Sequence, residues 1–320
     1  MTAPDDLRIG ISSCLLGEQV RFDGGHKKDG FITGTLEQFV QFVPVCPELE
    51  VGLGVPRESL RLVRPEPKGE VRIVAPKSGT DHTVAMRRYS KRRAKELAAL
   101  DLDGYLLKKD SPSCGFQRVK VYDHNNSPAR TGRGLFTEAL LNALPALPVE
   151  DEGRLNDPGL RENFFVRVFA YRRLKELFRG RWTPGQLVAF HTREKLLLRA
   201  HHEISYRELG RLVAQAKGMD RAQLRAAYEE GFMAALTHRA TIKRNVNVLQ
   251  HAAGYFKKLL GPREPQELAG LIEDYRRQLV PLIVPLTLLR HFVRIHEVDY
   301  LAGQTYLEPH PKELMLRNHV

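Results

Sequence analysis

Hydrophobic and polar positions follow two different patterns along the 320 residues. In the first half, short runs rich in β-branched and aromatic residues alternate with helical stretches, separated by turns that contain glycine and proline. Such alternation predicts an α/β domain with a mostly parallel sheet in three layers. The expected strands cover residues 8–13, 42–46, 71–75, 104–108 and 118–122, with a further one at 147–149. The expected helices cover 34–39, 84–100 and 136–144, and the proline-rich residues 64–70 are expected to form a loop.

From about residue 160 the apolar residues recur at helical spacing. The first broad stripe consists of Phe164, Phe165, Val168, Phe169, Leu174, Leu177 and Phe178. A clear helix start follows, with Thr183 as the cap, Pro184 in the first turn and Gln186 three residues after the cap. Further helices are expected at about 205–216, 220–235, 238–260, 265–279 and 281–296. The second half therefore predicts an all-α domain of five to seven helices.

The change of pattern lies near residue 150, where Pro145 and Pro148 precede an acidic stretch. The chain is also long enough for two domains of ordinary size. We therefore expect an α/β domain over residues 1–152 and an all-helical domain over residues 153–320.

The chain contains three cysteines, and each follows a predicted strand: Cys14, Cys46 and Cys114. In open α/β sheets, ligands bind outside the carboxyl ends of the strands, so three thiols at that edge suggest one site. Three ligands leave a four-coordinate metal or a four-iron cluster with one open position, which is typical of catalytic metal sites. On spacing alone, three unrelated buried cysteines explain the pattern about equally well.

Composition limits the cellular setting. An odd, low number of cysteines without Cys-x-x-Cys pairs argues against a disulfide framework. The acidic N-terminus lacks the pattern of a secretory signal, and no apolar run approaches the ~20 residues that span a bilayer. We therefore expect a soluble protein of a reducing cytoplasm, without a membrane partner.

The net charge is +12, of which residues 151–320 contribute +9. An excess of this size favours a polyanionic partner, most simply nucleic acid, although many basic surfaces only aid solubility.

The predicted helix over residues 238–260 concentrates this charge. Basic and polar residues recur at every fourth position and so share one helical face. Lysine and arginine suit phosphates, while tyrosine or histidine can stack on an unpaired base. The candidate RNA-binding residues are Arg239, Lys243, Arg244, Asn247, His251, Tyr255 and Lys258. A solvated helix face explains such a run about equally well.

Three weaker features remain open. The basic residues 87–95 could extend a phosphate track or only keep their helix soluble. Asp23 lies in a glycine-containing loop, where it could contact a substrate or simply form a tight turn. The histidines of the second half have too loose a spacing to favour a metal site.

Four ordered motifs make the cysteine site more specific. They are residues 12–17 (Ser-Ser-Cys-Leu-Leu-Gly), 20–24 (Val-Arg-Phe-Asp-Gly), 46–48 (Cys-Pro-Glu) and 111–115 (Ser-Pro-Ser-Cys-Gly). In order and spacing they resemble the thiouracil desulfidase family over the whole of residues 1–150. The second half, with Asn247, His251 and the run Gly-Tyr-Phe-Lys at 254–257, is similar to the helical YbgA-like domain often fused behind it. Two-domain relatives resemble enzymes that remove sulfur from 4-thiouridine in tRNA, whereas relatives with the first half alone act on free thiouracil.

The resemblance implies that Cys14, Cys46 and Cys114 hold a [4Fe-4S] cluster with one open iron. Thiolates are soft ligands that suit such clusters, and an open iron can act as a Lewis acid towards a thiocarbonyl sulfur. The resemblance also makes Glu48 and Ser111 the catalytic pair. We expect Glu48 to activate a water as general base and Ser111 to relay a proton to or from the ring nitrogen. Taken alone, Glu48 is better explained as a helix cap and Ser111 as a turn residue.

The leading hypothesis is therefore an iron–sulfur-dependent desulfidase that converts 4-thiouridine in tRNA to uridine and releases hydrosulfide. One alternative is a desulfidase of free thiouracil or a thionucleoside, with the helical domain serving oligomerisation or regulation. Another is a non-catalytic RNA-binding redox sensor that carries the cluster. The expected partner is tRNA, and nothing in the sequence implies an obligate protein partner.

Overall fold

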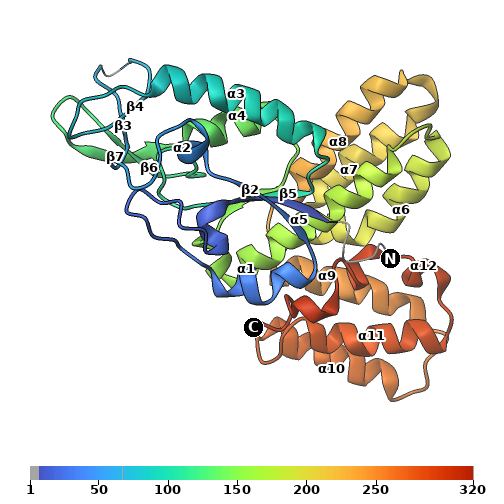
Figure 1. Cartoon of the computed structure of the whole chain (residues 1–320). Coiled ribbons are helices and arrows are strands. Elements are labelled where there is room, and N and C mark those ends of the chain that lie inside the picture. The colour runs from blue at the N-terminus through green and yellow to red at the C-terminus, as the bar shows by residue number, and fades with distance from the viewer. Residues whose placement is uncertain (1–6, 67, 320) are drawn as a thin grey trace. The chain divides into compact units, whose positions relative to one another are not determined.

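The computed structural model describes residues 7–66 and 68–319. Its contacts divide the chain into two compact units, residues 1–156 and residues 157–320 (Figure 1). No helix within the described residues is long and apolar enough to cross a membrane.

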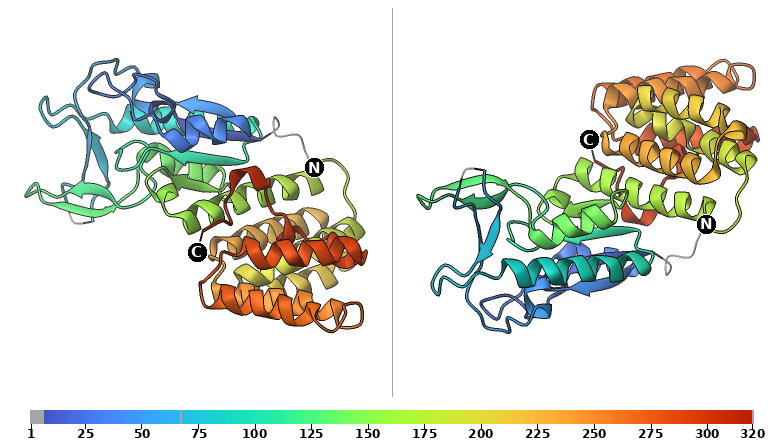
Figure 2. Two further views of the ribbon diagram at one scale, coloured as in Figure 1. Left: turned by 90° about the horizontal axis from the view of Figure 1, so that it is seen from below. Right: turned by 90° about the horizontal axis from the view of Figure 1, so that it is seen from above.

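The first unit is built on a parallel sheet in the strand order β2-β1-β5-β8. Its strands are β1 (Arg8–Ser12), β2 (Gln41–Val45), β5 (Gly104–Leu107) and β8 (Val149–Asp151). Ile9 and Ile11 of β1 are fully buried, as expected for a parallel strand covered on both faces. Figure 1 shows α3 (Thr83–Ala99) and α4 (Leu135–Ala143) on one side of this sheet and α1 (Gly30–Gly34) on the other, and Figure 2 gives views from both sides. The predicted three-layer α/β domain is confirmed.

A second, mixed sheet with the order β4-β3-β6-β7 was not foreseen. Its strands are β3 (Arg61–Val63), β4 (Arg72–Val74), β6 (Val119–Tyr122) and β7 (Pro128–Gly132). The strands expected at 71–75 and 118–122 belong to this sheet rather than to the parallel one. Residues 64–66 and 68–70 form neither helix nor strand, as expected of the loop, while residue 67 lies outside the described part.

The observed helix α1 begins at Gly30, earlier in the chain than the helix expected at 34–39. The helix α1 ends at Gly34, and a short 3-10 helix, Leu36–Gln38, follows it. The start is set by Asp29, whose carboxylate accepts hydrogen bonds from the backbone N–H groups of Phe31 and Ile32, both at 3.0 Å. An aspartate cap of this kind satisfies donors that the first turn of a helix leaves unpaired.

Gly10 carries a close contact between β1 and β5. It pairs with Tyr105 in the parallel ladder, and a Cβ at this position would overlap the fully buried Tyr105 ring. We therefore expect Gly10→Ala to destabilise the first unit by about 1–3 kcal/mol, the usual cost of overpacking a core. Urea denaturation followed by circular dichroism measures the change.

Gly30 supplies the matched control for this prediction. It opens α1, and a Cβ there would meet nothing within 4 Å. Alanine is the better helix former, so Gly30→Ala should leave stability unchanged or raise it by up to about 1 kcal/mol. Equal denaturation midpoints for the two variants would contradict the proposed packing of Tyr105 on Gly10.

The second unit is helical throughout, which confirms the all-α prediction. Its helices are α5 (Pro158–Leu177), α6 (Pro184–His201), α7 (Glu203–Ala214), α8 (Arg221–Thr237), α9 (Ile242–Ala253), α10 (Glu264–Arg276), α11 (Ile283–Ile295) and α12 (Asp299–Ala302). These are eight α-helices in the described residues, one more than the upper expectation, and the four-residue α12 accounts for the difference. The predicted start at Thr183 is a full capping box with Gln186.

The helix expected over 238–260 is much shorter than its sequence pattern suggested. It begins at Ile242 because the hydroxyl of Thr241 accepts a hydrogen bond from the backbone N–H of Arg244 at 3.3 Å. It ends at Ala253, and the next three residues, Gly254–Phe256, form a 3-10 turn. Residues 238–240, between α8 and Thr241, are therefore not helical and do not share the face of α9.

Candidate functional site

The three cysteines meet at the carboxyl edge of the parallel sheet. In that sheet β1 lies between β2 and β5, so the three strands that precede Cys14, Cys46 and Cys114 are neighbours. The backbone N–H of Lys108 donates to the hydroxyl of Ser12 at 3.0 Å, which joins the ends of β1 and β5. All three cysteines line one pocket of about 360 Å³.

The thiols of this pocket are free, and Cys14 and Cys114 are buried. Burial raises the pKa of Cys14 to about 11, with nearby Lys108 acting in the opposite direction. Burial also raises the pKa of Cys46 and of Cys114. Without a bound cation the three groups are therefore neutral thiols, and binding a metal would require the loss of their protons.

The three thiols share the lining of one pocket. Among residues 7–66 and 68–319, no group of three or more histidine, cysteine or acidic side chains is placed to hold a single metal ion. In an iron–sulfur cluster each thiolate binds a different iron, so the ligands stand apart around the cluster. Thiolates are the soft donors that such clusters use.

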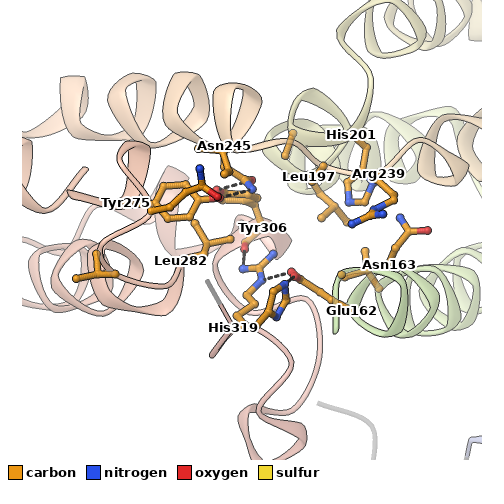
Figure 3. A pocket seen from close by; sticks show the side chains of 18 residues that line it. Glu162, Asn163, Leu197, His201, Arg239, Asn245, Tyr275, Leu282, Tyr306 and His319 are labelled. Carbon is orange, nitrogen blue, oxygen red and sulfur yellow. Dashed lines mark hydrogen bonds and ion pairs between the residues drawn. The ribbon is translucent and has the colours of Figure 1, made fainter. Parts of the chain in front are cut away.

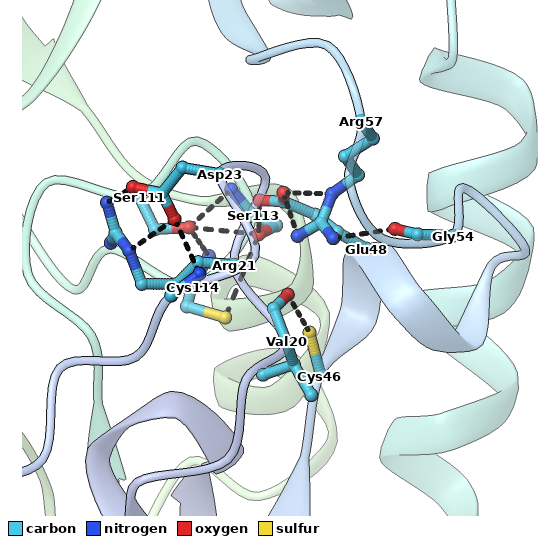
Figure 4. Close-up of polar contacts among 11 residues, drawn as sticks. Val20, Arg21, Asp23, Cys46, Glu48, Gly54, Arg57, Ser111, Ser113 and Cys114 are labelled. Atoms are coloured by element: carbon cyan, nitrogen blue, oxygen red, sulfur yellow. Dashed lines mark hydrogen bonds and ion pairs between the residues drawn. The ribbon is translucent and has the colours of Figure 1, made fainter.

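The same pocket contains Glu48, on the short helix α2 (Pro47–Glu50) directly after Cys46. One carboxylate oxygen, Oε2, accepts two hydrogen bonds from Arg57, from Nε at 3.1 Å and Nη2 at 2.8 Å. The other, Oε1, accepts a hydrogen bond from the Ser113 hydroxyl at 2.7 Å (Figure 4). The two side chains of the ion pair are largely buried, so Glu48 is held in one orientation.

A chain of hydroxyl groups connects Glu48 with Ser111. The Ser113 hydroxyl lies 2.9 Å from that of Ser111. Because Ser113 uses its single proton on Glu48, Ser111 must be the donor in this second hydrogen bond. The Ser111 oxygen also accepts the backbone N–H of Cys114 at 3.1 Å. The structure thus brings Glu48 and Ser111 into one pocket and links them through Ser113.

Sequence reasoning missed two members of this network. Ser113 lies inside the same motif as Ser111 and Cys114, so its position in that motif indicates a place in the site. Arg57 lies in a segment without helix or strand, and nothing in its local pattern indicates that it pairs with Glu48.

The loop after Cys14 borders the pocket through Val20, Arg21, Phe22 and Lys27. The Cys46 thiol lies 3.7 Å from the carbonyl oxygen of Val20 (Figure 4). Asp23 accepts the backbone N–H of Gly25 at 3.1 Å and forms an ion pair with Arg21. It does not line the pocket, so the tight-turn interpretation of Asp23 accounts for its contacts.

Basic residues outnumber acidic ones in the lining of the pocket. Its acidic lining residues are two, Glu48 and Asp110, whereas five are basic: Arg21, Lys27, Arg57, Lys108 and Lys109. Three of these cations are paired, Arg57 with Glu48, Arg21 with Asp23 and Lys108 with Glu152, so within the described residues Lys27 and Lys109 are the lining cations without an ion pair. Two unpaired lysines suit an anionic group on a substrate. The basic residues 87–95 on α3 contribute less, because Arg87, Arg92 and Arg93 form ion pairs with nearby glutamates.

Only some of the candidate RNA-binding residues are exposed on the helical unit. Lys243 and Asn247 on α9 are exposed, as are Tyr255 and Lys258 beyond its end, and His251 is half-buried. Arg244 donates to the backbone carbonyl oxygen of His201 at 2.7 Å, so it has a structural contact.

The placement of Arg239 on the face of α9 was wrong, since the helix begins after Thr241. Arg239 instead lines a separate cavity of about 210 Å³ within the helical unit (Figure 3). The nearest carboxylate oxygen in an ion pair with it, on Asp157, lies 3.9 Å away.

Comparison with known proteins gives matches for both parts of the chain. A family model described as 2-thiouracil desulfurase matches residues 9–152, which include the three cysteines, Glu48 and Ser111. A second model, for a protein family of unknown function called DUF1722, matches residues 195–311.

A protein described as uncharacterized protein YbgA from Escherichia coli (strain K12) is 34% identical over 160 residues, which are 49% of this chain and 94% of YbgA. A solved structure titled as the [4Fe-4S]-dependent thiouracil desulfidase TudS is 28% identical, covers 48% of this chain and 95% of its own, and has a TM-score of 0.37.

Proposed function

Because this chain belongs to the family of YbgA and joins a 2-thiouracil desulfurase domain to a DUF1722 domain, we propose that it removes sulfur from 4-thiouridine in tRNA. The products are uridine in the tRNA and hydrosulfide. The observation that carries this proposal is the pocket in which three free thiols lie beside the network of Glu48, Ser113 and Ser111.

The proposed cofactor is a [4Fe-4S] cluster held by Cys14, Cys46 and Cys114. The support is the donor set itself, three soft sulfur atoms at three neighbouring strand ends around one cavity. When bound, a cluster with three protein ligands supplies one open iron that acts as a Lewis acid towards the thiocarbonyl sulfur.

The side chains of the pocket supply the proton chemistry. Exchange of a thione for a ketone is a hydrolysis, in which one water enters, hydrosulfide leaves, and no net electrons move. Glu48 takes the proton of the attacking water on Oε1, because Arg57 occupies Oε2. Ser113 connects this carboxylate with Ser111, so a proton can pass along the two hydroxyls to or from the ring nitrogen of the base.

The choice of tRNA as substrate is supported by charge. Lys27 and Lys109, the lining cations without an ion pair within the described residues, suit a phosphate-bearing substrate. The second half contributes +9 of the net charge of +12, and Lys243, Asn247 and Lys258 stand exposed on its helical unit.

A free thiouracil or thionucleoside remains the second candidate substrate, for a specific reason. Every residue that lines the catalytic pocket belongs to the first unit, between Ser12 and Cys114. The chemistry therefore does not require the helical unit to complete the pocket.

The two substrates are separated by an anaerobic assay of the full chain reconstituted with iron and sulfide. We expect rapid loss of thiouridine absorbance and release of hydrosulfide with tRNA that contains 4-thiouridine, and a much slower reaction with the free nucleoside. Added salt should slow only the reaction on tRNA, because phosphate contacts weaken steeply with ionic strength. Turnover confined to the small molecules would contradict the tRNA proposal, and no turnover with four irons bound per chain would contradict the desulfidase itself.

A further inference from the structure

A group of aromatic and basic side chains lies together on the helical unit, although its members are far apart in the sequence. The aromatic patch, as we name it, consists of Lys195 on α6, His251 on α9, Tyr255 in the following 3-10 turn and Tyr300 on α12. The rings of Tyr255 and Tyr300 are stacked, with centroids 5.0 Å apart and an angle of 18°. The ring of His251 meets that of Tyr255 edge-on at 5.7 Å, and Lys195 Nζ lies 5.9 Å from the centroid of Tyr300.

The stacked pair is open to solvent. Tyr255 is 40% exposed even though Tyr300 covers part of it. Two rings held parallel at a surface form a rigid platform, on which a further flat ring can stack without the cost of first ordering the tyrosine. Nucleic-acid bases are flat rings that bind to proteins in this way, irrespective of their sequence.

The patch also contains an unused hydrogen-bonding group. The Nε2 atom of His251 is buried among these side chains and has no hydrogen-bond partner within the described residues. Buried polar groups in folded proteins are nearly always paired, so an unpaired nitrogen beside Tyr255 is unusual. Burial, together with nearby Arg199 and Lys195, lowers the pKa of His251. The ring is therefore neutral near pH 7 and offers one donor and one acceptor.

The cation of the patch is unpaired. Within the described residues, Lys195 forms no ion pair with an acidic side chain. Of the acidic residues nearby, Glu203 is held by two arginines, Arg199 at 3.0 Å and Arg207 at 3.2 Å, whereas the exposed Asp299 directly precedes Tyr300 on α12. Flat aromatic surface and unpaired cations together are the combination that proteins use for unpaired RNA, in which bases stack and phosphates contact lysine.

We propose that the aromatic patch binds an unpaired base of the RNA substrate, stacked on Tyr255, while Lys195 contacts an adjoining phosphate. This inference rests on the proposed function, because it names the surface by which the helical unit holds tRNA. It also gives Tyr300 a positioning role, since its ring supports that of Tyr255 from behind.

The test is the binding of tRNA that contains 4-thiouridine to the full chain, measured by fluorescence anisotropy over a range of salt concentrations. Tyr255→Ala should weaken binding about 5- to 150-fold, the value of one base stacked on an aromatic ring. It should leave the slope of affinity against salt unchanged, because no phosphate contact is lost. Tyr255→Phe should bind as the wild type does, since the ring face is retained.

Lys195→Met provides a second variant, which keeps both stacked rings and removes the cation beside Tyr300. It should weaken binding and reduce the salt slope by about 1, as expected when one phosphate contact is lost. Lys217→Met removes the same charge from an exposed residue in the 3-10 turn after α7 and should change neither quantity. All four variants should convert free 4-thiouridine at the wild-type rate, because the catalytic pocket lies in the first unit.

The two proposals fail in distinguishable ways. If the wild type binds tRNA tightly but Tyr255→Ala and Lys195→Met bind equally well with the same salt slope, the aromatic patch is not the RNA surface. If the wild type shows no salt-dependent binding to tRNA, the proposed substrate is wrong, and the patch assignment falls with it. A loss in Tyr255→Phe as large as that in Tyr255→Ala would also overturn stacking as the mode of binding.

Discussion

Replacing Cys114 with serine is expected to abolish desulfidation and to lower the iron bound by the reconstituted chain. Serine fits the space of the buried cysteine but offers a hard oxygen where a cluster needs a soft thiolate. Changes in groups that only support metal ligands already cost about 10- to 100-fold in affinity or activity, so loss of a ligand should exceed about 100-fold. Iron content, the visible absorbance of the cluster and hydrosulfide release measure the effect.

The control for this prediction is Ser90→Ala. Ser90 is fully buried on α3, and its hydroxyl has no hydrogen-bond partner within the described residues. Its removal deletes a buried oxygen outside the pocket and should leave iron content and turnover unchanged. Full activity and a full complement of iron in Cys114→Ser would mean that Cys114 is a packing residue and not a ligand. Cys14→Ser and Cys46→Ser should behave as Cys114→Ser does.

Glu48→Gln is expected to lower turnover about 10²- to 10⁴-fold while the iron content stays that of the wild type. A loss of this size is typical when a general acid or base is removed. Glutamine retains the shape of the side chain but cannot take a proton from water. Its amide group can still accept from Arg57, but it would present N–H groups to the Ser113 hydroxyl, which now donates to Oε1. Single-turnover rates measured anaerobically, alongside iron content, separate chemistry from assembly.

Neighbouring variants define the role of Glu48 further. Arg57→Lys keeps the positive charge but cannot make both hydrogen bonds to Oε2, so we expect a smaller loss of turnover than in Glu48→Gln. Ser111→Ala should also lower turnover without loss of iron, because it removes the end of the hydroxyl chain. Near-full turnover in Glu48→Gln with an intact cluster would exclude Glu48 as the base.

Local sequence patterns predicted the strands that carry the cysteines. Strands β1 and β5 are covered on both faces, so their apolar residues form continuous runs that stand out in the sequence. The start of α6 was equally visible, because the capping box at Thr183 is made within four residues. The second sheet was not visible, since β3 has three residues and β7, Pro128–Gly132, is mostly exposed. Such strands are defined by the partner they pair with and not by an apolar pattern.

The expected RNA-binding stripe shows why periodicity alone was not sufficient. Spacing by four residues extended the pattern back to Arg239. The hydroxyl of Thr241, however, caps the N-terminus of α9, so the helix begins after Arg239. Arg239 consequently lines a different cavity. Lys195 and Tyr300 join Tyr255 and His251 in the aromatic patch, but they come from other helices. No local sequence pattern indicates that these four residues lie together.

Local sequence patterns identify the residue types that this protein can use: three thiols at strand ends, a carboxylate directly after one of them, and a basic helical half. These features depend on neighbours within a few residues. The packing of the folded chain places β1 between β2 and β5, brings Arg57 and Ser113 to Glu48, and stacks Tyr255 on Tyr300. Contacts of this kind depend on which strands and helices pack together, and the packing free energy of a whole domain sets that choice.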